Sequence, residues 1–422
     1  MTFNMRNILW GGVFALISIF CLFVMVSCET GNGVKQTKAL QFSPAEQQLS
    51  QHCNDFSFNL LAQAAANEQS ENIILSPLSA SMLLGMLMNG ADGETLTQIR
   101  EMLGFEDAPI DEINDYYRQL IDVLPALDQY TLLNLANGIW VAERFPLQAD
   151  FVQACHQSFD AEAKNVPTFV DDNVLADINR FAAAHTNNRI KDIIDRSMVD
   201  DNTVMALVNA LYFKAKWKDK FKATQTHKQK FTTLNGVEIQ TDFMHRTDEM
   251  TYNEGDDFQL LELPYKGSKY CADIILPAEG INIRTFLASM DAERWHEMTS
   301  GMQYPRVELA LPKFSLKYQR CLNADLQALG MTDAFSGQAD FSRLSEHEAY
   351  LSLVNQYTFM QVDEEGTEAA AVTIGLVADK AAEPMDFRRF IADRPFLFVI
   401  RERDYGTILF TALIGHPEMQ KQ

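Results

Sequence analysis

The chain has 422 residues, of which 47% are hydrophobic and 10% aromatic, and its formal net charge is −22. This composition supports a large buried core and excludes an intrinsically disordered chain. The negative charge argues against nucleic acid or an anionic membrane surface as a partner, because both attract clustered positive charge. Length alone favours two domains, but residues 45–418 contain no Pro- or Ser-rich linker, which favours one large domain.

The N-terminal residues have the pattern of a targeting segment. Arg6 precedes an apolar run from Ile8 to Val26, and Ser27 and Cys28 follow it. A positive charge, an apolar stretch and a small residue before the cleavage point are the parts of a secretory signal. A Cys directly after the small residue resembles the lipobox of bacterial lipoproteins, in which the Cys is lipidated.

We therefore predict a lipoprotein signal peptide at residues 1–27, lipidation of Cys28, a polar tether at 28–44 and one domain at 45–420. The alternative is an uncleaved anchor, because about 20 apolar residues can span a bilayer. In both cases the domain is exported and held to a bacterial membrane, facing the periplasm or the cell exterior. We expect it to be a monomer.

The first element after the tether is a helix. Ser43 and Glu46 form a capping box, Pro44 occupies the first helical position, and apolar residues at helical spacing continue to about Asn67. In chain order the sequence then predicts a strand at Asn72–Ser76, helices at Pro77–Met88, Glu94–Leu103 and Asp111–Leu124, and strands at Leu132–Val141 and Thr203–Phe213.

Short strands dominate after Lys230. The sequence predicts strands at Val237–Met244, Phe258–Leu263, Tyr270–Leu276, Val307–Leu311, Tyr350–Val362, Phe396–Ile400 and Thr407–Gly415, with helices near Arg284–Met290 and Asn323–Leu329. Helices dominate the first half and strands the second, without regular alternation. This order indicates an α+β fold rather than a doubly wound sheet.

The enzyme signatures that a sequence can reveal are missing. The chain has no phosphate-binding loop, no dinucleotide-binding glycine motif and no Gly-x-Ser-x-Gly nucleophile elbow. His296 and His347 each precede a Glu but lack a second His four residues further on. A scattered triad stays open, but we predict no catalytic residue, no cofactor and no metal site.

The four cysteines beyond Cys28 are scattered and form no Cys-x-x-Cys motif: Cys53, Cys155, Cys271 and Cys321. This spacing favours buried free thiols over a zinc or redox site, and disulfides stay open because sequence spacing does not report Cα separation. A closely spaced basic run also stands out: Lys214, Lys216, Lys218, Lys220 and Lys222 alternate around Trp217 and Phe221. A polyanion site is one reading of this run, and a solvated face beside buried aromatics is the favoured one.

The segment that follows Val362 is unusual in its side chains. From Ala369 to Ala378 they are small or apolar and uncharged, and the next strong element begins at Pro395, only after 28 residues beyond Gly366. Connections of this length are usually functional loops or disordered. Side chains alternate in a strand, so one face would carry Thr367, Ala369, Ala371, Thr373, Gly375 and Val377. Glu368 would lie on the opposite face, where its charge can stay in water.

Several ordered motifs between Leu49 and Pro417 resemble the serpin family. The matching stretches are Asn72–Ser79, Asn89–Thr95, Asn209–Trp217 with Phe221, Leu311–Phe314, Asp340–Ser342 and Asp393–Phe398. The resemblance implies one domain of helices around three β-sheets, with an exposed reactive-centre loop at about residues 364–392. It implies a suicide inhibitor: a target protease cleaves the loop and forms an acyl-enzyme, and the loop then inserts into the main sheet as a new strand.

The resemblance also assigns roles to residues of the loop. The hinge is formed by Glu364, Glu365, Gly366, Thr367, Glu368, Ala369, Ala370, Ala371 and Thr373. In inhibitory members the cleaved bond usually follows the residue sixteen positions after the hinge Glu, which gives Lys380–Ala381 and a trypsin-like serine protease as the target. Counting back from Pro395 gives a bond near Pro384 instead. Arg388 and Arg389 are further baits, and the apolar Ile374–Val377 would suit elastase-like enzymes. Cysteine proteases stay open as targets.

Other matches fall where the sheet is expected to open. Ser76, Ser79 and Asn209 match positions beneath the opening region, and Trp217 matches one at the point of first insertion. Gln356 stands where many members carry His. An amide can replace a neutral imidazole in hydrogen bonding, but it does not protonate at mildly acidic pH. We expect no pH sensitivity from this position.

Two function classes follow from the sequence. The first is a membrane-tethered suicide inhibitor of serine proteases. The second is a non-inhibitory member of the same fold that serves as a carrier or binding protein. Bulky, charged or Pro residues in the hinge would favour the second class, and the inward-facing hinge positions have none.

Overall fold

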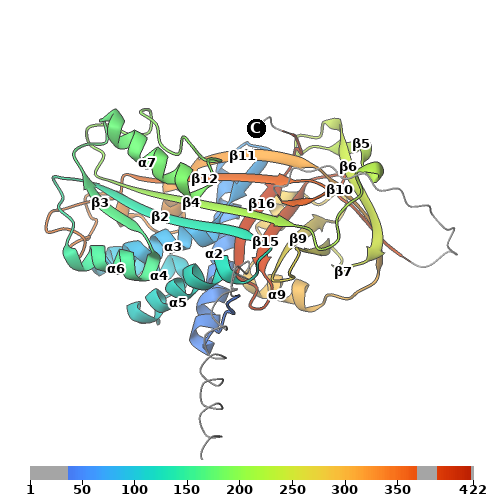
Figure 1. Ribbon diagram of the computed structural model, residues 1–422, viewed down its shortest axis with the longest axis horizontal. Coiled ribbons are helices and arrows are strands. Elements are labelled where there is room, and N and C mark those ends of the chain that lie inside the picture. Colours follow the sequence, from blue (N-terminus) through green and yellow to red (C-terminus); the bar gives the residue numbers. More distant parts are fainter. Residues whose placement is uncertain (1–36, 368–386, 420–422) are drawn as a thin grey trace, which may run out of the picture. The chain divides into compact units, whose positions relative to one another are not determined.

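A computed structural model of the chain describes residues 37–367 and 387–419 (Figure 1). The helices are α2 (Pro44–Asn67), α3 (Pro77–Met88), α4 (Gly93–Leu103), α5 (Ile110–Val123), α6 (Ala149–Phe159), α7 (Asp172–His185), α8 (Ile283–Leu287), α9 (Ala292–Ser300) and α10 (Asn323–Ala328). Short 3-10 helices are η1 (Leu124–Ala126), η2 (Ala223–Gln225) and η3 (Asp333–Phe335).

The strands are β1 (Asn72–Leu75), β2 (Leu132–Ala142), β3 (Glu162–Val166), β4 (Met205–Lys216), β5 (His227–Thr232), β6 (Glu238–Glu249), β7 (Thr251–Glu254), β8 (Phe258–Pro264), β9 (Tyr270–Pro277), β10 (Arg306–Pro312), β11 (Phe314–Cys321), β12 (Leu353–Val362), β13 (Gly366–Thr367), β14 (Arg388–Ile391), β15 (Phe396–Glu402) and β16 (Ile408–Ile414). They form three sheets, as expected for the resemblance.

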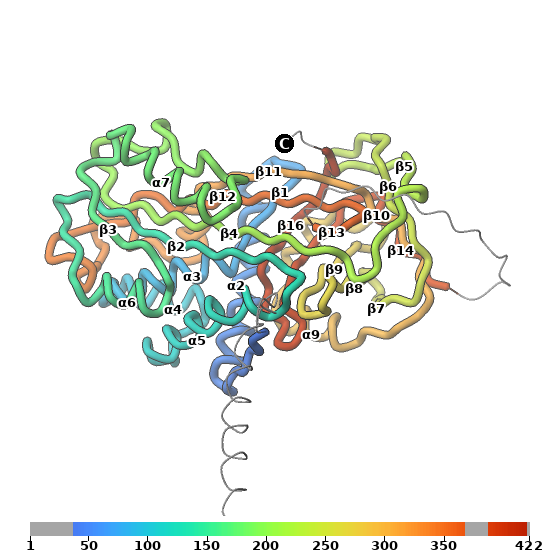
Figure 2. Tube along the Cα trace, in the orientation of Figure 1, coloured from blue at the N-terminus to red at the C-terminus, as the bar shows by residue number. Residues whose placement is uncertain are grey.

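The central sheet has the order β11-β12-β13-β4-β2-β3, the core sheet β1-β16-β15-β9-β8-β7, and the small sheet β14-β10-β6-β5. Helix α3 packs against β2 and β4, and α7 packs against the same two strands from the other face of the central sheet (Figure 1). The small sheet carries β14 at its edge, beside β10 (Figure 2). The predicted α+β architecture is confirmed.

Local chemistry explains where the main elements begin and end. The Ser43 side chain accepts from the Glu46 N–H, and the Glu46 side chain accepts from the Ser43 N–H, so the predicted capping box starts α2. Gly104 adopts a left-handed conformation with φ of 71° and ends α4. Every residue of α3, β9, β15 and β16 is buried, which fits their continuous apolar runs.

The expected loop at about 364–392 is shorter than predicted. Gly366 and Thr367 form β13, and Arg388–Ile391 form β14, which pairs in parallel with β10. Phe390 is buried, so its side chain anchors this end of the loop in the small sheet. Helices α6, α7 and α9 were not predicted, although apolar side chains at helical spacing, such as Phe151, Cys155 and Phe159, line the buried face of α6.

The cysteine prediction is confirmed for Cys53, Cys155 and Cys271, which are buried free thiols, and is wrong for Cys321, which is free but exposed at the end of β11. The predicted signal peptide and the predicted lipidation site, Cys28, lie outside the described residues. Within residues 37–367 and 387–419, no helix is both long and apolar enough to span a bilayer.

Candidate functional site: a partly inserted hinge in the central sheet

The central sheet divides between β4 and β12. The two strands run parallel and pair directly from Leu353 opposite Ala206 to Tyr357 opposite Ala210. Further along, β13 lies between them and is antiparallel to both, with Thr367 opposite Val362 on β12 and Ala215 on β4. The chain therefore turns back after β12 and places two residues of the predicted hinge inside the sheet.

Thr367 faces the interior, as the alternation of side chains predicted. Its side chain is only 3% exposed, and its hydroxyl lies 2.6 Å from the hydroxyl of Tyr265. The Tyr265 ring stacks on Trp217 with centroids 4.6 Å apart and planes 7° apart. Burial raises the pKa of Tyr265 well above its usual range, so the phenol stays protonated.

Gly366 lies too close to β4 for any side chain. A Cβ atom at this position would collide with the backbone oxygen of Ala215 and the Cα atom of Lys216. The position therefore requires Gly for a steric reason, the close approach of two backbones.

The turn between β12 and β13, which we call the hinge turn (residues 363–365), is held by the segment that follows β4. This segment, residues 217–226, is called the strap. Every strap group in these contacts donates, and every hinge-turn group accepts. The bonds run from Trp217 N to Glu365 O (2.9 Å), Trp217 Nε1 to Asp363 O (2.9 Å), Phe221 N to Glu364 O (3.1 Å), Thr226 Oγ1 to Glu364 Oε1 (2.8 Å) and Lys220 Nζ to Glu365 Oε2.

Charged groups also stabilise the hinge turn. Glu364 pairs with Lys313 at 2.8 Å, and both side chains are mostly buried. Burial raises the pKa of Glu364, but the hydrogen bonds from Lys313 and Thr226 outweigh it, and the net shift is downward. Burial raises the pKa of Asp363, and the amides of Glu365 and Gly366 oppose that shift.

Replacing Lys313 with Met is expected to lower the free energy of unfolding by about 1 kcal/mol at neutral pH, since Glu364 then loses its cation in a half-buried place. Because the folded pKa of Glu364 is depressed, this stabilisation is present above the unfolded pKa and disappears as the pH falls below it. Urea unfolding at neutral pH and at about pH 3.5 measures the difference, which should shrink in acid. The matched control is Lys228→Met, whose exposed pair with Asp242 spans 3.3 Å and should contribute under about 0.5 kcal/mol.

Three of the predicted sheet-opening residues lie together at the base of the gap between β4 and β12, the space whose other end β13 occupies. The Gln356 amide donates to Ser76 O at 2.8 Å and accepts from Ser76 N at 2.9 Å. The Ser76 hydroxyl donates to Ser79 Oγ at 2.8 Å. All three residues are buried. Gln356 thus uses both its donor and its acceptor, as expected for an amide in place of imidazole.

Asn209 lies opposite Gln356 in the register but hydrogen bonds away from it. Its side-chain nitrogen donates to Asn137 Oδ1 at 2.6 Å. Its own oxygen is buried and has no hydrogen-bond partner among the described residues. Asn137, Tyr265 and Thr226 were not predicted as site residues. The only signal for Asn137 was a polar residue within an apolar strand.

Some of the remaining predicted loop residues belong to the part of the chain that the structure describes, and others do not. Glu368, Ala369, Ala370, Ala371, Thr373, Lys380 and Ala381 lie outside the described residues, as does Pro384. Arg388 and Arg389 are fixed in β14, where they pair with Glu254 at 3.3 Å and Glu308 at 3.0 Å. A protease needs its substrate in an extended, accessible loop, so this strand argues against either Arg as the bait. The lysines beside Trp217 and Phe221 are mainly exposed while both aromatic rings are buried, as the solvated-face reading predicted.

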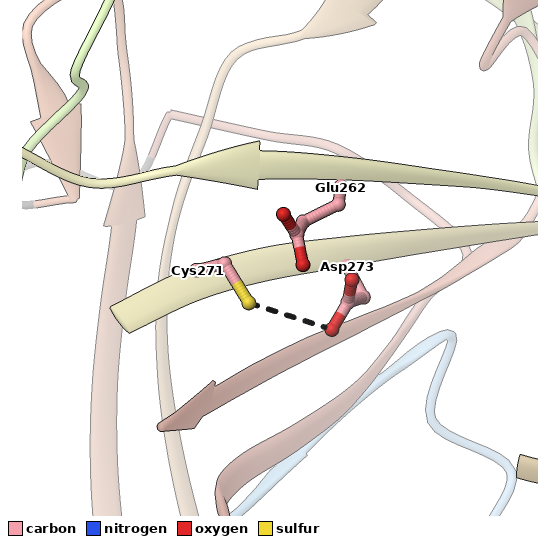
Figure 3. A group of neighbouring side chains, drawn as sticks. All are labelled: Glu262, Cys271 and Asp273. Carbon is pink, nitrogen blue, oxygen red and sulfur yellow. Dashed lines mark hydrogen bonds between the residues drawn. The ribbon is translucent and has the colours of Figure 1, made fainter. Parts of the chain in front are cut away.

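One buried group of side chains offers metal-ligand atoms. Glu262, Cys271 and Asp273 place a thiol and two carboxylates within 4.8 Å of one another (Figure 3). However, Arg401 contacts Asp273 at 2.6 Å and Glu262 at 2.7 Å, and Arg403 contacts Glu262 at 2.7 Å. Both carboxylates are therefore already neutralised by guanidinium groups. We assign the group to structural ion pairing in the core sheet.

Comparisons with known proteins agree with this geometry. The model of the Serpin family (serine protease inhibitor) matches residues 51–417. Human neuroserpin is 30% identical over 413 residues, which cover 96% of this chain and 97% of neuroserpin. The native structure of the thermophilic serpin tengpin is 30% identical, with a TM-score of 0.82 and coverage of 90% of this chain and 97% of tengpin. The structure of thyroxine-binding globulin with thyroxine is 28% identical, with a TM-score of 0.79 and coverage of 88% and 100%. The chain belongs to the serpin family.

Proposed function

We propose that the protein is a suicide inhibitor of serine endopeptidases, with trypsin-like enzymes preferred. The observation that carries the proposal is β13, because two residues of the hinge, Gly366 and Thr367, already occupy the place of a new strand between β4 and β12. The turn required for insertion is therefore formed before any protease arrives. After cleavage, insertion only has to extend an existing strand.

The register of β13 tells where later residues of the loop would go. Continued at one residue per step, residue 373 falls opposite Gln356 on β12 and opposite Asn209 on β4, and those two residues already pair with each other. The two independent pairings therefore agree on one register. Thr373 would bring a hydroxyl donor to the polar base of the gap, where the Asn209 oxygen lacks a partner.

If β13 were continued in the same register, Glu368 would lie beside Lys214 on β4 and beside Gln361 on β12. Lys214 is half-buried and lies on the face opposite to Thr367. A carboxylate and an ammonium group opposite one another on neighbouring strands attract each other. The one charge between Gly366 and Ala378 would thus gain a partner on insertion and would not have to enter the interior.

Incubation of the domain with trypsin tests the proposal. A complex that survives boiling in SDS is expected, because the acyl bond between protease and loop is trapped. Trypsin whose catalytic serine has been blocked should give no such complex. Quantitative cleavage with full retention of trypsin activity would contradict inhibition of this protease class. N-terminal sequencing of the released C-terminal peptide locates the bond, and Ala381 is the expected first residue.

A carrier function is the second candidate. Thyroxine-binding globulin shows that a chain of this fold can bind a small molecule. Here a cavity of about 360 Å³ lies beside α2 and α9 and is lined by His52, Trp295 and Arg401, among others. The inserted, small-chained hinge favours inhibition over this alternative. We also propose that the protein is exported and tethered through a lipid on Cys28, on the strength of the N-terminal sequence pattern.

A further inference from the structure

A row of titratable and charged side chains crosses the small sheet from edge to edge. It consists of His227 on β5, His245 on β6, Glu308 on β10 and Arg389 on β14. The two imidazole rings are stacked with centroids 4.0 Å apart and planes 6° apart. Glu308 and Arg389 form an ion pair at 3.0 Å. Glu308 lies one step diagonally from His245 across the β6–β10 register, on the same face of the sheet.

Both ends of this row meet the ends of the reactive loop. His227 directly follows Thr226, the strap residue whose hydroxyl donates to Glu364 in the hinge turn. At the other end, Arg389 belongs to β14, the first described strand after the loop (Figure 2). The histidine pair is therefore next to the strap along the chain at one end and one diagonal position from the Glu308–Arg389 ion pair at the other.

His245 resists protonation. Nδ1 of His245 lies 3.1 Å from the carbonyl oxygens of Gln225 and Phe243, and Nε2 lies 3.1 Å from Oε1 of Gln229. These acceptors can hold the charged ring, but burial and the neighbouring His227 disfavour it, and together they lower the pKa of His245. Two imidazolium rings cannot remain stacked at 4.0 Å without strong repulsion.

The groups that face the pair from each neighbouring element are few. Strand β5 contributes His227 and Gln229, η2 the Gln225 carbonyl, β6 Phe243, and β10 Glu308, whose carboxylate opposes the shift. Arg389 of β14 faces Glu308. By strand alternation, Arg246 and the Lys228–Asp242 pair lie on the other face of the sheet.

The sign of the pH dependence follows from the depressed pKa. A histidine that is harder to protonate in the folded arrangement stabilises that arrangement fully above its ordinary pKa, and the stabilisation disappears as the pH falls below about 6.5. A protonated His245 that leaves the stack would compete with Arg389 for Glu308. Acid is therefore expected to weaken the contacts at both ends of the row, beside η2 and at β14.

We propose that the stacked His227–His245 pair is an acid-sensitive latch that holds both supports of the reactive loop at neutral pH and loosens them in mildly acidic solution. Its effect on inhibition rests on the proposed function, but the loosening itself can be measured without a protease. Gln356 does not titrate and so gives no pH response. The histidine pair, at a different place in the sequence, would give one.

Hydrogen–deuterium exchange at about pH 7.5 and 5.5, corrected for intrinsic exchange rates, tests the latch. Amides of residues 223–231 and 388–391 should exchange about tenfold faster in acid in the wild-type protein. His245→Gln, which keeps hydrogen-bonding capacity without titrating, should reduce that difference to less than about twofold. His416→Gln is the matched control, since His416 pairs with Glu71 elsewhere in the fold, and it should keep the wild-type response.

Equal protection of these amides at both pH values in the wild-type protein would overturn the proposal, as would an unchanged acid response in His245→Gln. If that variant does not fold, His227→Gln replaces it, because it also leaves a single imidazole, and the same outcomes apply. A protein that fails to inhibit trypsin at neutral pH but shows the acid response would refute the inhibitor function and leave the latch standing.

Discussion

Replacing Thr367 with Arg is expected to turn the protein from an inhibitor of trypsin into a substrate. Thr367 is buried between β12 and β4, where its hydroxyl contacts that of Tyr265, and a guanidinium there would have to leave water. Burying such a charge costs several kcal/mol, so the hinge should stay outside the sheet and insertion should stall. The fraction of loop cleavages that end in an SDS-stable complex should fall by about 100-fold, because a slower insertion lets the acyl-enzyme hydrolyse first.

The alternation of side chains between the two faces of a strand provides the matched control. Glu368→Arg introduces the same side chain one position later, on the face that alternation places toward solvent. It should keep most of the inhibition, apart from any loss due to Lys214. Circular dichroism and urea unfolding of both variants verify that the domain folds. Equal inhibition by Thr367→Arg and the wild type would refute the insertion mechanism.

Replacing Lys380 with Leu is expected to abolish inhibition of trypsin and to create inhibition of chymotrypsin-like enzymes. Trypsin binds a basic side chain through an acidic group at the base of its specificity pocket, and Leu offers no charge. The rate of complex formation with trypsin should fall by about 100-fold or more, since removing a charge-matched contact leaves the pocket carboxylate unpaired. Progress curves with both proteases measure the exchange of specificity.

Arg388→Leu separates Lys380 from the competing bait. Arg388 is exposed in β14 and pairs with Glu254, an interaction that contributes at most about 1 kcal/mol. Its replacement should leave trypsin inhibition within about twofold of the wild type, the change expected for a contact remote from the cleaved bond. Loss of inhibition in Arg388→Leu, with Lys380→Leu unaffected, would move the cleaved bond into or next to β14.

Elements with strong local signals could be predicted from the sequence. The capping box at Ser43 and the apolar runs of β9, β15 and β16 are signals contained within a few residues. The predicted boundaries of these elements differ from the observed ones by at most two residues. The inward direction of Thr367 was also predictable, because alternation depends only on counting along one strand.

What the sequence could not show depends on distant contacts. The strap and the hinge turn are about 140 residues apart, and no local pattern indicates that donors in one meet acceptors in the other. The two-residue strand β13 is too short to carry a periodicity, and its existence depends on the space between β4 and β12. The stacked histidines are separated by 18 positions and meet only through the β5–β6 register.

The position of β13 also affects whether two copies of the protein can associate at high concentration. Among the described residues, β12 and β4 pair directly only as far as Tyr357 and Ala210, and β13 lies between them at Val362. Between these two pairings, the edges of β12 and β4 face each other across a gap. Such an edge can template the pairing of a strand from a second molecule. A strand from another copy would enter at the open end of the gap, and Gly366 and Thr367 already fill that end. Gly366 and Thr367, which would begin loop insertion, would therefore also block self-association through this gap.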